Sequence, residues 1–273
     1  MDIVDTQVHV FLTIGGQEAL AAMDALGIRS VIIDEFWGYD AQNNPQPGVI
    51  LEGGSFRPMS PLAQAAAMRH PDRFSYLQRV RPSDPDLQGL FAILASSPGC
   101  RSVRIDLRED AEKKALLNGG YDALFALAQR HGLPLDVLGA DTAALLTRSV
   151  RAFPELIFVI DHCGLPTSDE HWQDVLALGS SANVMLKWIH APRVFKTPHY
   201  PFPELAAPLR RAIDIFGIER IMWGSDFTAN RTGHTWGELL FYIRDSANAL
   251  SISDTEWLLA KTARKIYGWP ITV

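Results

Sequence analysis

The sequence predicts an α/β fold, a (β/α)8 TIM barrel that forms a single domain over residues 1–273. Apolar, often β-branched runs alternate with helical patterns eight times along the chain, which favours parallel strands joined by helices. The length of 273 residues suits such a barrel, which takes roughly 250 residues. No linker or low-complexity tract divides the chain. An open doubly wound sheet is the alternative, although no Gly-rich phosphate-binding loop follows the first strand.

Each predicted strand is followed by a predicted helix. The predicted strands are Ile3–Val10, Ser30–Asp34, Phe74–Val80, Arg101–Ile105, Leu133–Val137, Leu156–Asp161, Asn183–Lys187 and Arg220–Gly224. The predicted helices are Gln17–Leu26, Pro61–His70, Leu87–Ala95, Tyr121–His131, Thr142–Phe153, Asp169–Leu178, Pro203–Phe216 and His234–Ala249, with a final helix around Leu258, Leu259 and Ile266. This alternation implies right-handed crossovers between neighbouring parallel strands.

Several helix ends carry their own signals. Asp141 precedes a predicted helix and is a candidate cap for it. Ser253 and Glu256 have the spacing of a capping box ahead of the final helix. Gly132 and Gly217 follow helical patterns at positions where a left-handed residue often ends a helix.

Composition limits the class of protein. A hydrophobic content of 47% supports a sizeable core, and a net charge of −6 without a basic cluster argues against a nucleic-acid partner. No apolar stretch approaches the roughly 18 residues of a membrane span, and no secretory signal pattern begins the chain, so a cytoplasmic protein is expected. The two cysteines, Cys100 and Cys163, indicate neither a disulfide framework nor a metal pair. A homo-oligomer is an open expectation, since dimers are common.

The segment Glu35–Met59 stands out because it separates the second strand from its helix by far more than the usual few residues. It follows the carboxyl end of a strand, the catalytic face of a barrel, and contains Trp37, Tyr39 and Arg57. We interpret it as a long loop that covers or binds a substrate. A structural excursion over the side of the barrel is the alternative.

Polar side chains end several of the apolar strand patterns. Gln7 and His9 are two residues apart and therefore face the same side of the first strand. His162 and Asp226 end the sixth and eighth strands, and Lys187 lies on the seventh. Each has an ordinary structural explanation when it is taken alone. A barrel brings these strand ends around one mouth, however, and together the residues have the composition of an active site.

Five segments resemble the motifs of amidohydrolase-related TIM-barrel hydrolases, in the same order along the chain. They are Asp5–His9, Asp161–Pro166, Val184–Lys187, Gly224–Phe227 and Thr262–Trp269, which resemble Asp-x-His-x-His, Asp-His-x-Gly-x-Pro, Val-x-x-Lys, Gly-Ser-Asp and Asn-Ala-x-Arg-Leu-Tyr-Gly. Each motif is weak alone, but the ordered set spans nearly the whole chain. The branch most similar to it contains dicarboxylate lactonases, aldonolactonases and related C–O hydrolases, beside decarboxylating relatives.

The resemblance implies hydrolysis of a small, carboxylated lactone or ester by water. Asp226 would act as general base and then as the acid that protonates the leaving alkoxide, since a partly desolvated site can raise the pKa of a carboxylate toward neutrality. His9 and His162 would orient the water or polarise the carbonyl. Ester, lactone and amide all require the same attack.

One departure from the family pattern concerns its metal site. Gln7 replaces the first histidine of the first-strand motif, and an amide is a poor zinc ligand. The fifth strand also ends without a histidine. We therefore expect catalysis without a metal. If a divalent metal such as zinc is present, His9, His162 and Asp226 are its expected ligands. A zinc-dependent hydrolase or decarboxylase, and a barrel that only binds a small carboxylate, remain the alternatives.

Cationic side chains near strand ends would then stabilise the developing oxyanion and bind an anionic substrate. The expected substrate contacts are Gln7, Trp37, Arg79, Arg104, Lys187 and Arg231, with Arg81 and Arg108 as further cations. Arg104 and Lys187 are favoured because each lies within an apolar strand pattern. For each arginine the alternative is an ordinary salt bridge. His190 and His199 either line the pocket or anchor a Pro-rich loop, of which we favour the anchor, and Cys163 is expected to face away from the site.

Overall fold

The structure is a computed structural model that describes residues 1–12, 14–37, 47–229, 233–245 and 250–269. Eight parallel strands form one sheet in chain order. They are β1 (Val4–Val8), β2 (Ser30–Asp34), β5 (Phe74–Arg79), β6 (Cys100–Asp106), β7 (Leu135–Leu138), β8 (Phe158–Ile160), β9 (Val184–Trp188) and β10 (Ile221–Trp223). The sheet closes where the Thr6 hydroxyl donates to the Trp223 carbonyl at 2.8 Å and the Asp226 amide donates to the Gln7 carbonyl at 2.9 Å. The predicted TIM barrel is confirmed.

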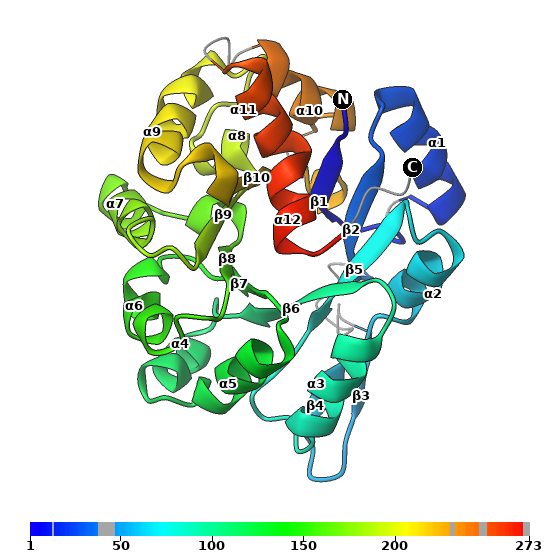
Figure 1. Cartoon of the computed structure of the whole chain (residues 1–273), viewed down its shortest axis with the longest axis vertical. Coiled ribbons are helices and arrows are strands. Elements are labelled where there is room, and N and C mark those ends of the chain that lie inside the picture. The colour runs from blue at the N-terminus through cyan, green and yellow to red at the C-terminus, as the bar shows by residue number, and fades with distance from the viewer. Residues whose placement is uncertain (13, 38–46, 230–232, 246–249, 270–273) are drawn as a thin grey trace.

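Helices surround the strands (Figure 1). They are α1 (Gly16–Leu26), α2 (Pro61–Arg69), α3 (Leu87–Ser96), α4 (Asp110–Leu117), α5 (Asp122–His131), α6 (Ala143–Ala152), α7 (Asp169–Leu178), α8 (Ala191–Val194), α9 (Ala206–Phe216), α10 (Trp236–Asp245), α11 (Ile252–Glu256) and α12 (Thr262–Ile266). The predicted helices are present, with ends that differ by a few residues. The sequence did not predict α4 and α8, because α8 is a single turn and α4 buries only Leu116 in full.

Two predicted helix caps are wrong. Thr142, rather than Asp141, precedes α6, and the Asp141 carboxylate instead accepts hydrogen bonds from the Thr167 amide at 2.9 Å and the Thr167 hydroxyl at 2.7 Å. The final helical segment begins two residues earlier than expected, so the capping box pairs Ser251 with Asp254. Thr142 makes no capping hydrogen bond through its side chain, whereas Ser251 accepts one from the Asp254 amide.

The predicted glycine ends differ from each other. Gly132 ends α5 with φ 64° and ψ 25°, the left-handed conformation that was expected. Gly217 follows α9 with φ 77° and ψ 142°, which lies outside the left-handed helical region. A positive φ is still required there, and glycine adopts it without the steric cost of a Cβ atom.

Part of the Glu35–Met59 segment forms regular structure. Strands β3 (Gly48–Ile50) and β4 (Phe56–Pro58) pair in an antiparallel hairpin, so a continuous long loop after the second strand is not confirmed. The Arg57 guanidinium binds the Asp84 carboxylate at 2.6 Å and ties the hairpin to the barrel. Tyr39 lies outside the described residues.

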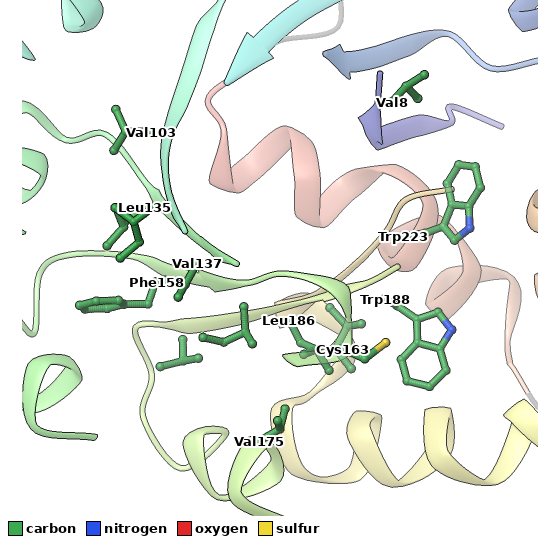
Figure 2. Close-up of a cluster of buried hydrophobic side chains, with 14 of the residues drawn as sticks. Val8, Val103, Leu135, Val137, Phe158, Cys163, Val175, Leu186, Trp188 and Trp223 are labelled. Atoms are coloured by element: carbon green, nitrogen blue, oxygen red, sulfur yellow. The ribbon is translucent and has the colours of Figure 1, made fainter. Parts of the chain in front are cut away.

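A large apolar core lies between the strands and the surrounding helices. Figure 2 shows part of it, with Val103, Leu135 and Phe158 among the labelled side chains. A second cluster fills the barrel interior, where strand residues pack with the C-terminal segment after α11. Its strand residues are Val4, Ile32, Leu77, Val159, Met185 and Met222, and its C-terminal residues are Ala260, Ala263, Tyr267 and Trp269.

Strand alternation places a charged layer beyond this inner cluster. Side chains two residues apart share a face of a strand, so the residue two positions after each apolar interior residue also points inward. Asp34 follows Ile32 in this way, and Lys187 follows Met185. Arg79 and Asp161 occupy the same step after Leu77 and Val159. The interior therefore changes from apolar to charged toward the carboxyl ends of the strands.

Candidate active site

A cavity of about 1360 Å³ opens at the carboxyl ends of the strands. His9, His162, His190 and Asp226 all line it. These four residues follow β1, β8, β9 and β10, so segments far apart in the sequence supply one cluster. Functional sites of barrel enzymes lie at this face, where loops from different strands converge.

Three imidazole rings surround the Asp226 carboxylate. His9 Nε2 lies 3.1 Å from Oδ1, and His162 Nε2 lies 3.0 Å from Oδ2. His190 Nε2 lies 2.8 Å from Oδ2. Asp226 itself is only 2% exposed. The carboxylate is therefore the centre of the cluster and is shielded from bulk water.

The backbone of this cluster is strained. His162, His190 and Asp226 have φ angles of 52°, 54° and 47°. Residues with a Cβ atom rarely adopt such values, and each costs on the order of 1 kcal/mol. Sharp left-handed turns at the strand ends bring these side chains to the cavity. Strain of this kind is common at functional sites and indicates a function for these residues.

The partners of His9 determine its protonation state. Its Nδ1 lies 2.7 Å from the Asp34 carbonyl oxygen, which can only accept, and its Nε2 faces the Asp226 carboxylate. Neutral imidazole carries one N–H, so only the imidazolium satisfies both acceptors. Burial would lower the pKa of His9, but the charge and hydrogen bond of Asp226 outweigh it and raise the pKa.

The pKa values of His162 and Asp226, which belong to the same cluster, are lowered instead. Burial lowers the pKa of His162 to about 4, despite the nearby Asp226, so His162 is neutral at pH 7. Burial alone would raise the pKa of Asp226, as the sequence led us to expect, but the adjacent His9 and His190 hold it well below its usual range, so the expected rise is wrong. At neutral pH the cluster thus contains an ionised Asp226, a protonated His9 and a neutral His162.

His162 gives a testable pH dependence. Its pKa is depressed to about 4 in the folded state, whereas a free histidine titrates near 6.5. The unfolded chain therefore binds the extra proton first, and His162 reduces stability as the pH falls from about 6.5 through 4. Relative to His162→Gln, the free energy of unfolding of the wild type should fall with a slope approaching about 1.4 kcal/mol per pH unit. Urea unfolding of both proteins between pH 7 and 4 measures it. Parallel curves would show that His162 is not desolvated.

Behind the cluster, Asp34 holds two arginines of the charged layer. Arg79 Nε donates to Asp34 Oδ1 at 2.8 Å, and Arg104 Nη1 binds Asp34 Oδ2. Arg104 Nε also donates to Asp161 at 2.7 Å. Both arginines line the cavity, as the sequence predicted. Arg104 Nη2 is buried and has no hydrogen-bond partner among the described residues, so this nitrogen can bind an anion.

Lys187 is placed differently from the prediction. It is completely buried, binds Asp136, and lies 3.3 Å from Asp161. It is not part of the cavity lining. Because Asp161 in turn binds Arg104, Lys187 acts on the cavity only through these ion pairs. The strand pattern gave its inward direction correctly but could not give its depth in the barrel.

Three other predicted substrate contacts do not lie in the described cavity lining. Gln7 is buried and donates through Nε2 to Asp34 at 3.2 Å. Trp37 is 53% exposed, and its indole donates to Glu35 at 2.8 Å. Arg231 lies outside the described residues. Among the predicted substrate-binding residues that the structure describes, Arg79 and Arg104 line the cavity, and so does Arg108, one of the two further cations.

The interpretation of His190 as a loop anchor is wrong. It lies two residues after the last residue of β9, as His162 lies two residues after the last residue of β8. This shared offset was a signal in the sequence, but the prolines that follow favoured a loop. Cys163, in contrast, lies away from the carboxylate: its thiol is buried, contacts the Ile189 carbonyl at 3.4 Å, and burial raises its pKa.

The cluster can also hold a metal ion. Ligand atoms of His162, His190 and Asp226 all lie within 4.8 Å of one another. Two histidines and a carboxylate are a donor set used by catalytic zinc sites. The Nε2 atoms of His162 and His190 both face Asp226 Oδ2, at 3.0 and 2.8 Å, so the three ligand groups converge. The fitting set contains His190 in place of the predicted His9.

Comparisons with known proteins show the family of this chain. The sequence profile of the amidohydrolase family matches residues 13–269. The L-fucono-1,5-lactonase of Burkholderia ambifaria is 29% identical over 161 residues, which are 54% of this chain and 52% of that protein. The match thus spans about half the length of that curated relative.

Solved structures share the fold. A zinc-bound amidohydrolase from Burkholderia multivorans superimposes with a TM-score of 0.77 at 17% identity, over 99% of this chain and 100% of that chain. The 5-carboxyvanillate decarboxylase of Sphingomonas paucimobilis superimposes with a TM-score of 0.67 at 14% identity, over 98% of this chain and 99% of that chain. No helix in the described part of the chain is long and apolar enough to cross a membrane.

Proposed function

Because this chain belongs to the amidohydrolase family, we propose that it hydrolyses a small lactone or ester that carries a carboxylate. The observation that carries the proposal is the Asp226 carboxylate, held among three histidines in a cavity that Arg104 also lines. The similarity to a lactonase supports a C–O bond as the target. Arg104 Nη2 supports the carboxylate, since a buried guanidinium nitrogen without a partner favours an anionic ligand.

In the proposed reaction, Asp226 accepts a proton from a water molecule, and the water oxygen bonds to the substrate carbonyl carbon. His162, neutral at pH 7, keeps the carboxylate oriented through its contact at 3.0 Å. The cationic His9 and Arg104 stabilise the oxyanion that develops, because charges act strongly in a site shielded from water. The C–O bond then breaks, and Asp226 returns the proton to the leaving alkoxide. The product of a lactone is a hydroxy acid.

The depressed pKa of Asp226 affects the two halves of this cycle differently. Asp226 is ionised at neutral pH and can accept a proton, but it is a weaker base than an ordinary carboxylate. Once protonated, it is a strong acid beside an alkoxide that needs a proton. The same group therefore serves both halves of the reaction without a second acid.

We propose that this reaction proceeds without a metal. Arg104 and His9 already supply positive charge, and Gln7 occupies the position of a family metal ligand. The alternative is a divalent ion on His162, His190 and Asp226, which the converging ligand atoms favour. A zinc ion bound there would polarise a carbonyl and lower the pKa of water. In that case Arg104 would only bind the substrate carboxylate and would not be needed to stabilise the oxyanion.

The test is elemental analysis of protein purified without added metal, combined with hydrolysis of a panel of carboxylated lactones with and without chelator. We expect turnover that resists chelator in protein with well below one metal per chain. The neutral analogues of the same lactones serve as controls for the carboxylate. Stoichiometric zinc with chelator-sensitive turnover would establish the metal-dependent alternative. Absence of hydrolysis both with and without chelator would refute the proposed function.

A further inference from the structure

The cavity is larger than a small lactone requires. Its volume of about 1360 Å³ exceeds the range of roughly 300–1000 Å³ that is typical for small-molecule sites. The Asp226 cluster and Arg104 occupy the end formed by the strands. The remaining lining comes from the beginning of α7, from α8 and the turn after it, and from α9. Helices α7 and α9 lie at the periphery of the barrel (Figure 1), so the cavity extends outward from the reaction centre.

Three exposed cations line this outer part, which we call the outer subsite. They are Arg193 and Lys196, which lie in and after α8, and Arg211 on α9. Neither Arg193 nor Lys196 has a side-chain hydrogen bond or ion pair with any residue in the described ranges. The arginines at the inner end differ, because Arg79 and Arg104 are both bound to aspartates. Arg193 and Lys196 are therefore free to bind a ligand.

Acidic residues do not cancel this charge. Asp169 and Glu204 also line the outer subsite. Asp169 lies in the first turn of α7, where the positive end of the helix dipole compensates a carboxylate. Arg211 donates to Gln173 at 2.6 Å through a neutral hydrogen bond, so it keeps its full charge. The outer subsite therefore holds three cations against two carboxylates, one of which lies at the positive end of a helix.

The segment that carries two of these cations is held in place. Phe195, which lies between Arg193 and Lys196 in the sequence, packs between Trp188 and Trp172 with ring centroids 5.5 and 5.2 Å away. The amide of Thr197 donates to the Pro192 carbonyl at 2.8 Å and closes the turn. The backbone positions of the cations are therefore fixed before a ligand binds, which reduces the entropy lost on binding.

The outer subsite also has an apolar floor. Leu165, Pro166, Trp172, Val194, Phe195 and Pro208 line the cavity there. An apolar surface between the reaction centre and the cations suits a short carbon chain that joins a reacting carbonyl to a distant charge. A substrate that ends at the lactone ring would leave this surface in water.

We infer that the outer subsite binds a second anionic group of the substrate, a phosphate or a carboxylate, several bonds away from the scissile C–O bond. The inference rests on the proposed hydrolysis and names the class of substrate: an extended lactone or ester with an anion at its far end. Arg193 and Lys196 determine the specificity for that anion, and they have no part in the chemical step.

The test uses γ-lactones with side chains of two, four and six carbons that end in phosphate, carboxylate or a hydroxyl group. For lactones with side chains of equal length, kcat/KM should be about tenfold higher when the side chain ends in an anion than when it ends in a hydroxyl group. Two exposed ion pairs contribute up to about 1.4 kcal/mol, which corresponds to this factor. The preferred anion distinguishes a phosphate ester from a dicarboxylic substrate. In the double variant Arg193→Gln/Lys196→Gln this preference should disappear through KM, while kcat and turnover of the hydroxyl series stay unchanged.

The matched control is Arg69→Gln/Lys114→Gln, which removes the same charge from exposed positions on α2 and α4 outside the cavity lining. It should keep the preference. Equal kcat/KM for all three end groups in the wild type would overturn the inference and leave the proposed hydrolysis intact. Loss of the preference in the control as well would assign the effect to net charge and also overturn it. Absence of turnover with every lactone would refute the proposed function together with the inference.

Discussion

Replacement of Asp226 by asparagine is expected to lower kcat for lactone hydrolysis by about a thousandfold, while substrate still binds. General acid–base groups contribute roughly 10²–10⁴ to rate, and in the proposed cycle Asp226 performs both proton transfers. Asparagine has the same shape and keeps an oxygen for the histidines, but it cannot accept the proton. Steady-state kinetics and isothermal titration with an unreactive carboxylated analogue measure the two quantities.

The same experiment separates a hydrolase from a barrel that only binds a carboxylate. A binding protein would show no turnover in the wild type and would keep its ligand in the variant. Asp122→Asn makes the same chemical change at a surface ion pair with Arg148 and should leave kcat unchanged. Turnover in Asp226→Asn above a tenth of the wild-type value would exclude Asp226 as the base.

Replacement of Arg104 by methionine should raise KM for carboxylated substrates by up to about a hundredfold, because hydrogen bonds to charged groups contribute about 1.5–3 kcal/mol. The KM of the neutral analogues should change less, since they lack the partner of Nη2. Both substrate classes should lose kcat, because Arg104 also stabilises the oxyanion in the proposed reaction. Stability should fall by about 3–5 kcal/mol, because Asp34 and Asp161 would lose a cation in a buried network. Kinetics with both substrate classes and urea unfolding measure these effects.

A second variant covers the case in which the methionine protein does not fold. Arg104→Lys keeps the charge between Asp34 and Asp161 but has no planar fork, so it should fold and still raise KM for carboxylates. Arg101→Lys makes the same change in the same strand, at a residue that contacts Ser75 and the Gly268 carbonyl. It lies outside the cavity lining and should leave KM unchanged. A KM for Arg104→Lys equal to the wild type would remove Arg104 from the substrate site.

The proposed function links the strained turns to the chemistry. His162, His190 and Asp226 are each turned by a left-handed residue at a strand end. This places the imidazoles of His162 and His190, which follow two separate strands, within hydrogen-bond distance of the Asp226 carboxylate. The surrounding barrel, with its apolar inner cluster closed by the C-terminal segment, supplies the rigidity that maintains such strain. The stability of the fold therefore supports the geometry of the site.

The order of strands and helices could be predicted from the sequence alone. Apolar runs and helical patterns are local signals, and a parallel strand buried on both faces, such as Ser30–Asp34, reads as a continuous apolar run. The positions of His9, His162 and Asp226 at strand ends followed from the same local patterns. The family motifs added an expected reaction, because their order along the chain resembles known hydrolases.

Only the tertiary structure decided which of these residues meet. His190 and Lys187 show why: both lie in or near β9, yet His190 reaches the Asp226 carboxylate and Lys187 is buried against Asp136 and Asp161. Strand alternation fixes the direction of a side chain, but its depth depends on how neighbouring strands are staggered, which is a property of pairing between distant segments. The protonation states of His9 and His162 differ for the same reason, since burial and charged neighbours set them. The sequence by itself determined the barrel and most of its catalytic candidates, and the closure of eight strands determined their contacts and charges.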